Sequence, residues 1–126
     1  MTKIWERYSP KLAEDKFDAI IIGSGMGGLS TAAFLSKAGK KVLVLERHFK
    51  VGGWTHTFQR GKYEWDVGIH YIGAVGRKSA FLRKLFDEVT EERLEWAPMP
   101  DNYDRMIFPD KSYNFIAGKD RFIDQM

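Results

Sequence analysis

The residues of this chain whose types and spacing point to chemistry are three glycines and one acid. Gly23, Gly25 and Gly28 form the pattern G-x-G-x-x-G, and Glu46 follows the third glycine by 18 residues. In such a pattern the first glycine permits a tight turn, the second admits a pyrophosphate close to the backbone, and the third lets a helix pack closely on a sheet. A carboxylate at about this distance accepts hydrogen bonds from an adenosine ribose and repels a 2′-phosphate, which argues against NADP. Together the four residues predict a dinucleotide-binding site.

The segments around these glycines occur in the order that such a site needs. Residues 17–22 end in three isoleucines and predict a strand that is buried on both faces. Residues 29–38 predict a helix, Gly39 fits the position that ends it, and residues 42–45 predict a second buried strand. Strand, turn, helix and strand make one right-handed βαβ unit with parallel strands. We therefore expect an α/β fold with a Rossmann-like βαβ unit, of the kind that binds FAD or NAD(P).

The chain divides into three parts. Residues 1–16 predict a polar leader, residues 17–76 hold the βαβ unit with a glycine pair and a hairpin, and residues 77–126 predict a helix and strands that begin a substrate domain. The elements expected after the acid are a hairpin of 55–60 and 63–67, an ordered loop over 67–76, a helix over 77–89, a short strand over 94–96, a second hairpin of 103–108 and 112–116, and the first turns of a helix over 119–126.

The helix predicted over residues 77–89 is amphipathic. Its apolar positions are Phe81, Leu82, Leu85 and Phe86. We expect this face to belong to the core. Its basic positions are Arg77, Lys78, Arg83 and Lys84. A peripheral membrane contact through this helix is the alternative.

Composition excludes several classes of protein. The 126 residues are 44% hydrophobic and 29% charged with a net charge of +3, which is typical of one globular domain with a sizeable core and is too weak an excess to indicate nucleic-acid binding. The chain has no cysteine, and His48, His56 and His70 do not have metal-ligand spacing, so we expect no metal site. There is no membrane-spanning run and no signal peptide, and we expect a cytoplasmic rather than a secreted protein.

The residues after the acid resemble the FAD-dependent amine oxidase and phytoene desaturase superfamily. In that group a glycine pair follows the acid, here Gly52 and Gly53 after Glu46, and a hairpin then leads to an acid–x–glycine element, here Asp66 and Gly68. The resemblance implies FAD, although both FAD and NAD use this βαβ unit and the glycine loop alone does not choose between them. The cofactor-binding residues that it implies are Gly23, Ser24, Gly25, Gly27, Gly28, Glu46, Arg47, Gly52, Gly53, Trp54 and Thr55.

Three stretches narrow the resemblance to one branch of this superfamily. Residues 52–58, 65–73 and 94–98 are similar to the all-trans-retinol 13,14-reductases, which are relatives of carotenoid isomerases and phytoene desaturases. The similarity runs from about Phe17 to the last residue. Trp54 stands where many phytoene desaturases have arginine, which favours the retinol-reductase branch and puts in doubt any arginine–flavin contact.

This resemblance implies a flavoprotein oxidoreductase that acts on carbon–carbon double bonds of an apolar isoprenoid or polyene substrate. Relatives of this kind are several times longer, so we expect this chain to carry the ADP-recognition half of a site and to lack turnover alone. Two other functions stay open: an NAD-binding dehydrogenase fragment and a non-catalytic nucleotide-binding module.

Three residues of the most specific stretch are candidates for the flavin's surroundings. These are Asp66, Gly68 and His70. A histidine there can orient a flavin or donate a proton near neutral pH, but we favour a structural role in which His70 bonds to the backbone. The sequence therefore assigns no catalytic residue.

Overall fold

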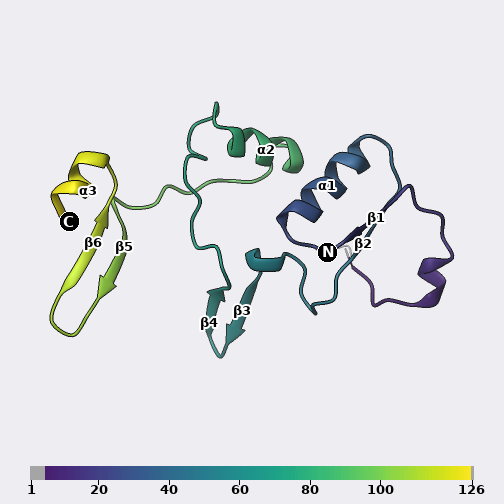
Figure 1. Ribbon diagram of the computed structural model, residues 1–126, viewed down its shortest axis with the longest axis horizontal. Helices are drawn as coiled ribbons and strands as arrows, with labels where there is room; N and C mark the ends of the chain where they lie inside the picture. The colour runs from purple at the N-terminus through teal and green to yellow at the C-terminus, as the bar shows by residue number, and fades with distance from the viewer. Residues whose placement is uncertain (1–4, 126) are drawn as a thin grey trace.

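The N-terminal part of the fold is one βαβ unit. In the computed structural model, which describes residues 5–125, β1 (Ala19–Ile22) and β2 (Val42–Leu45) pair in parallel with Ile22 opposite Leu45, and α1 (Met26–Lys37) connects them. Gly39, with a φ of 77°, lies directly after the helix cap, as predicted. Figure 1 shows this unit at one end of the molecule. The predicted parallel βαβ unit is confirmed.

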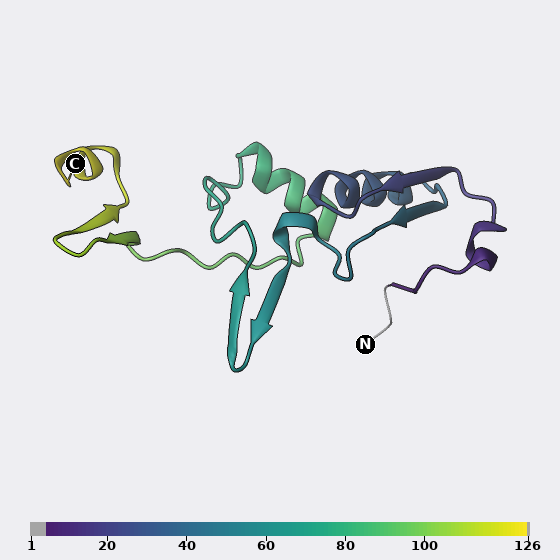
Figure 2. The same cartoon turned by 60° about the horizontal axis from the view of Figure 1, so that its bottom comes forward.

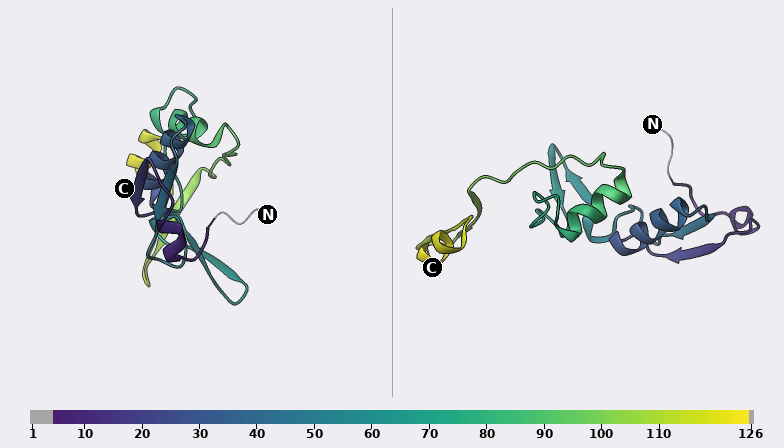
Figure 3. Two further views of the ribbon diagram at one scale, coloured as in Figure 1. Left: turned by 90° about the vertical axis from the view of Figure 1, so that its right-hand side faces the viewer. Right: turned by 90° about the horizontal axis from the view of Figure 1, so that it is seen from above.

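The sheet of this unit is covered on one face only. Helix α1 packs on the face that holds Ile21, and Figure 3 shows the helix on one side of the two strands. On the other face Ile20 is 61% and Ile22 is 88% exposed. The prediction that the first strand is buried on both faces is therefore wrong for the described residues, because no described element lies against this second face.

A hairpin and a second helix follow. After β2 come a short 3-10 helix η2 (Gly53–Thr55) and the antiparallel strands β3 (Thr57–Arg60) and β4 (Tyr63–Asp66), which Figure 2 shows projecting from the body. A loop then leads to α2 (Phe81–Thr90), and the expected boundary between residues 76 and 77 falls in this loop. The Lys37 Nζ and Glu88 Oε1 atoms lie 3.0 Å apart and join α1 to α2.

The helix α2 is less buried than the sequence predicts. Phe81 is 77% and Leu82 is 42% exposed, whereas Phe86 packs edge-on against the Trp96 ring at 5.2 Å. The predicted strand over residues 94–96 is absent from the described structure, since this segment is extended without a neighbouring strand to pair with. The core-facing role is thus correct only for the part of the helix near Trp96.

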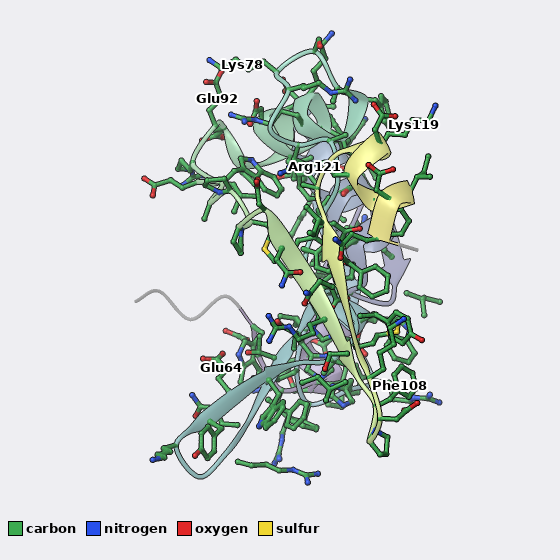
Figure 4. All side chains as sticks on the ribbon, turned by 90° about the vertical axis from the view of Figure 1, so that its left-hand side faces the viewer. Glu64, Lys78, Glu92, Phe108, Lys119 and Arg121 are labelled. Carbon is green, nitrogen blue, oxygen red and sulfur yellow. The ribbon has the colours of Figure 1, made fainter. Side chains whose placement is uncertain are left out.

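The C-terminal part is a small body at the far end of an extended connection (Figures 1 and 2). It contains the antiparallel strands β5 (Asn102–Ile107) and β6 (Ser112–Ile116) and the helix α3 (Lys119–Gln125). In Figure 4 Phe108 lies at the turn of this hairpin, and Lys119 and Arg121 lie on α3 at its other end. The second predicted hairpin is confirmed, as is the final helix as far as the described residues extend.

Few side chains of the described residues are fully buried. Val75, at 7% exposure, is the one buried apolar side chain, and Ser24, at 1%, is the one buried polar side chain. The expectation of a sizeable core is therefore wrong for residues 5–125. Of the expected leader, residues 1–4 lie outside the described residues, and the rest contains the 3-10 helix η1 (Pro10–Ala13). None of the described helices has the length and apolar character needed to cross a membrane.

Candidate dinucleotide site

The glycine-rich loop connects β1 to α1 with the geometry that its sequence predicts. Gly23 has a φ of 96°, which a residue with a side chain adopts only under strain. A Cβ atom on Gly28 would lie 2.1 Å from the Gly23 carbonyl oxygen and 3.3 Å from Ile21 Cγ2. The third glycine therefore lets the first turn of the helix pack directly on the loop and the strand, and its predicted packing role is confirmed.

The loop leaves an open cradle at the start of α1. Gly25 is the helix N-cap and gives no side-chain hydrogen bond to the helix. Cβ atoms built on Gly25 and Gly27 would meet nothing within 4 Å. The first N–H groups of a helix have no partner within it, and the helix dipole favours negative charge at this end. These donors suit an anionic diphosphate lying against the glycine backbone.

The predicted ribose acid is held against this loop. Glu46 Oε2 accepts hydrogen bonds from the Ser24 amide at 2.8 Å and from the Ser24 hydroxyl at 2.6 Å, and Oε1 accepts one from the His48 amide at 2.7 Å. The Ser24 hydroxyl, followed by the His48 and Ser24 amides, lowers the pKa of Glu46 from its ordinary 4.5 to about 2. Hydrogen bonds to both oxygens thus orient the carboxylate, as the predicted ribose recognition requires.

The glycine pair closes on the same loop from the other side. The Gly52 amide donates to the Ser24 carbonyl at 3.1 Å and to the Ser24 hydroxyl at 3.2 Å. A Cβ atom on Gly53 would lie 3.0 Å from Gly25 Cα. The Thr55 hydroxyl donates to the Gly52 carbonyl at 2.7 Å and fixes the turn. The folded chain therefore brings the glycine loop, the acid and the glycine pair together, although 28 residues separate Gly53 from Gly25.

Two of the predicted cofactor residues, Trp54 and Arg47, lie outside this hydrogen-bonded cluster. Trp54 is 75% exposed, yet its side chain packs against Gly68, where a Cβ atom would lie 2.9 Å from Trp54 Cε3. This contact connects the glycine pair to the acid–x–glycine element. Arg47 is exposed and adds no side-chain contact to the cluster among the described residues.

The flavin-proximal candidates lie beyond the hairpin. Asp66 ends β4, and its Oδ2 atom lies 3.6 Å from His70 Nδ1. The His70 side chain is 66% exposed. The expected backbone hydrogen bond of His70 is therefore wrong: the Asp66 carboxylate is its neighbour instead, because the loop turns the ring back toward the end of the strand.

The other two histidines form a pair at the surface beside the glycine pair. The His48 and His56 rings lie 4.9 Å apart, and His56 Nδ1 lies 2.6 Å from the Gly53 carbonyl oxygen. Among residues 5–125 no group of three or more histidine, aspartate or glutamate side chains is placed to hold a metal ion.

A hollow of about 940 Å³ lies beside the start of α1. Its walls come from α1, from the loop over residues 68–73, from α2 and from Asp104 of β5. The apolar side chains that line it include Met26, Phe34, Ile69, Tyr71, Leu85 and Phe86. His70 also reaches this hollow, so the specific loop of the sequence borders an apolar space next to the glycine loop.

The fold and the cradle agree with the comparison to known proteins. A family model described as the NAD(P)-binding Rossmann-like domain matches residues 21–89. The chain belongs to this Rossmann-like family. A dinucleotide is accordingly the cofactor class that its loop serves.

The curated relatives of this Rossmann-like chain are longer proteins. It is 44% identical over 122 residues to the all-trans-retinol 13,14-reductase of Rattus norvegicus and 42% identical over 122 residues to that of Homo sapiens, which is 94% of this chain and 20% of each relative. It is 47% identical over 53 residues to the prolycopene isomerase of Daucus carota, or 42% of this chain and 9% of that protein. The chain thus spans about a fifth of the length of the reductases, and the predicted resemblance to their N-terminal part is confirmed.

Sequence reasoning missed two features of the Rossmann-like site. It named Ser24 as a cofactor-binding residue but not as the buried link between Glu46 and Gly52, because a single serine between two glycines carries no sign of its distant partners. It also missed the apolar hollow. The helical spacing of Leu82, Leu85 and Phe86 was the available signal, but it does not show which helix they face.

Proposed function

We propose that this chain is the N-terminal FAD-binding portion of an oxidoreductase that acts on carbon–carbon double bonds of an apolar polyene. The observation that carries the choice of FAD is the approach of the glycine pair, in which Gly53 packs on Gly25 and Gly52 bonds to Ser24. In NAD dehydrogenases another helix normally begins after the acid, whereas here a glycine turn packs on the glycine loop, which supports a longer cradle. Such an extension suits a dinucleotide whose second half continues beyond the loop.

The residues present fit FAD at its ADP end. The amides at the start of α1 would hold the diphosphate, and Glu46 would accept a hydrogen bond from the adenosine ribose. The open space over Gly25 is where a diphosphate would approach. Bound FAD supplies two-electron chemistry at carbon–carbon double bonds, and this chain's residues bind and orient it.

The choice of substrate is supported by the relatives and by the hollow. The reductases are named for all-trans-retinol and the isomerases for prolycopene. Both names denote elongated apolar molecules with conjugated double bonds. The apolar walls of the hollow between α1 and α2 offer such a molecule a place next to the glycine loop.

A peripheral membrane contact would deliver a lipid-soluble substrate, and α2 supports it. Phe81 is 77% exposed at the start of this helix, and the exposed side chains of Arg77, Lys78 and Lys84 lie within four residues of it in the sequence. We expect Phe81→Ser to reduce sedimentation of the full-length protein with vesicles that contain a fifth phosphatidylserine. Exposed Phe49→Ser on the βαβ side is the matched control, and equal sedimentation of all three proteins would refute the contact.

The uncovered sheet face supports a further part of the proposal, that additional chain completes the fold. A parallel sheet is stable when both faces are covered, and Ile22 is 88% exposed here. The thiol of an Ile22→Cys variant should react with a thiol reagent far more slowly in the full-length protein than in residues 1–126. Equal rates would refute this completion.

The cofactor proposal is tested by thermal unfolding of the full-length protein freed of nucleotide. FAD should raise the melting temperature, and NAD at the same concentration should raise it less. A protein that NAD stabilises and FAD does not would support the dehydrogenase alternative. Binding of either nucleotide without any redox change of an added polyene would support the non-catalytic module.

A further inference from the structure

The hydroxyl of Ser24 joins two parts of the site through hydrogen bonds whose directions are fixed. The Gly52 amide can only donate, so the Ser24 oxygen accepts at 3.2 Å. The Glu46 carboxylate can only accept, so the single hydroxyl proton goes to Oε2 at 2.6 Å. The chain of bonds therefore runs from the glycine-pair turn through Ser24 to the ribose acid.

The burial of Ser24 makes this link rigid. Its side chain is 1% exposed, and it is the one fully buried polar side chain of the described residues. Hydrogen bonds in series strengthen one another when water is excluded, and a bond to a charged acceptor is stronger than one between neutral groups. The carboxylate is consequently held in one orientation before any nucleotide arrives.

The same bonds determine which part of the carboxylate a ribose can use. A carboxylate offers about four acceptor positions. The Ser24 amide and hydroxyl take both positions on Oε2, and the His48 amide takes one on Oε1. At most one position, on Oε1, remains for a ribose hydroxyl, and the Arg47 amide also lies close enough to lower the pKa of Glu46.

We propose that Ser24 is a positioning residue for ribose recognition, acting through Glu46 rather than by touching the nucleotide. This inference rests on the proposed function, because it assumes that Glu46 receives the adenosine ribose. Removal of the hydroxyl leaves Glu46 with the Ser24 amide alone on Oε2, so the carboxylate gains freedom that a ribose must then remove. The Gly52 amide keeps its bond to the Ser24 carbonyl at 3.1 Å, so no buried donor loses its last partner.

The test compares ADP with 2′,3′-dideoxy-ADP on full-length protein freed of nucleotide, by isothermal titration calorimetry. Ser24→Ala should weaken ADP binding about tenfold, the loss of one hydrogen bond to a charged group, and should change the affinity for the dideoxy compound about twofold or less. Ser36→Ala, at an exposed serine on helix α1, should change neither affinity. Ser24→Cys keeps the side-chain size with a weaker donor and replaces S24A if that variant aggregates; its preference for ADP should also fall.

A double-mutant cycle separates this role from a structural one. Because Ser24 acts through the acid, Glu46→Gln with Ser24→Ala should bind ADP no more weakly than Glu46→Gln alone. Additive losses, or equal losses for ADP and the dideoxy compound, overturn the positioning role. If the unaltered protein binds ADP, E46Q weakens binding and S24A does not, this inference alone fails. If the unaltered protein binds neither FAD nor ADP, the proposed function fails and this inference fails with it.

Discussion

Gly53 lies so close to Gly25 that a Cβ atom on Gly53 would be 3.0 Å from the Gly25 Cα atom. The contact joins the turn after the ribose acid to the N-cap of α1. It requires that Gly53 has no side chain, whereas a Cβ atom on Gly25 would meet nothing within 4 Å. This is the relationship that places the glycine pair within the predicted cradle.

The first prediction concerns the cost of a side chain at Gly53. Gly53 has a φ of 57° and Gly61, in the β3–β4 turn, has a φ of 60°, but a Cβ atom on Gly61 would meet nothing within 4 Å. Gly61→Ala should therefore lower the free energy of unfolding by roughly 1 kcal/mol, through backbone strain alone. Gly53→Ala should lower it further and should also weaken FAD binding. Urea unfolding and FAD titration of both variants measure this, and identical losses would show that the contact with Gly25 is unimportant.

Alanine substitutions at Gly28 and Gly27 should change the stability of the protein in opposite directions. A Cβ atom on Gly28 would lie 2.1 Å from the Gly23 carbonyl oxygen, while one on Gly27, in the same helical turn, would point into open space. Gly28→Ala should destabilise the protein by about 3 kcal/mol through overpacking. Gly27→Ala should raise the free energy of unfolding by roughly 0.5 kcal/mol, since alanine favours the helix. A Gly28→Ala protein as stable as the unaltered one would contradict the packing role.

Gly25→Ala should weaken FAD binding while leaving the stability of the protein nearly unchanged. Its φ is −66° and a Cβ atom there would meet nothing within 4 Å, so Gly25→Ala should leave the free energy of unfolding within about 0.5 kcal/mol. The same methyl group would occupy the space through which a diphosphate approaches the helix N-terminus. FAD affinity should fall at least tenfold by calorimetry. Unchanged affinity would mean that the diphosphate lies elsewhere.

The hydrogen bonds of Glu46 make its contribution to stability depend on pH. Ser24 and His48 stabilise the charged form and lower the pKa to about 2 in the folded protein, against 4.5 ordinarily. The resulting contribution to folding is fully present above pH 4.5 and is lost as the pH falls toward 2. Unfolding measured from pH 6 to pH 2 should lose less stability in Glu46→Gln than in the unaltered protein. Asp101, whose pKa Arg121 also lowers, supplies the control variant Asp101→Asn, which should retain the Glu46 part of the loss.

The parts of the fold that sequence predicted well are those decided by neighbours in the chain. The second strand was predicted at residues 42–45, where β2 lies, because a short apolar run between lysines and an acid leaves little choice. The hairpins followed from turn residues between alternating segments. Helix α1 begins at Met26, three residues before the predicted start, since its glycines enter the helix despite their low propensity.

What sequence could not predict depends on contacts between distant segments. The isoleucine run of β1 indicates a covered strand, but whether Ile20 and Ile22 are covered depends on elements that are absent from the described residues. Leu94–Trp96 has strand composition and no strand beside it. In the site, the spacing of the glycines and the acid can be recognised in the sequence. The burial of Ser24 between Glu46 and Gly52 arises only when the chain folds.

The measurement that tests the FAD site most directly is the identity of the nucleotide released from the purified full-length protein. Denaturation followed by chromatography and absorption at about 450 nm should give FAD at about one per chain, and at a much lower ratio from Gly25→Ala. Release of NAD in place of FAD, or the same FAD content in Gly25→Ala, would contradict a flavin site built on this glycine loop.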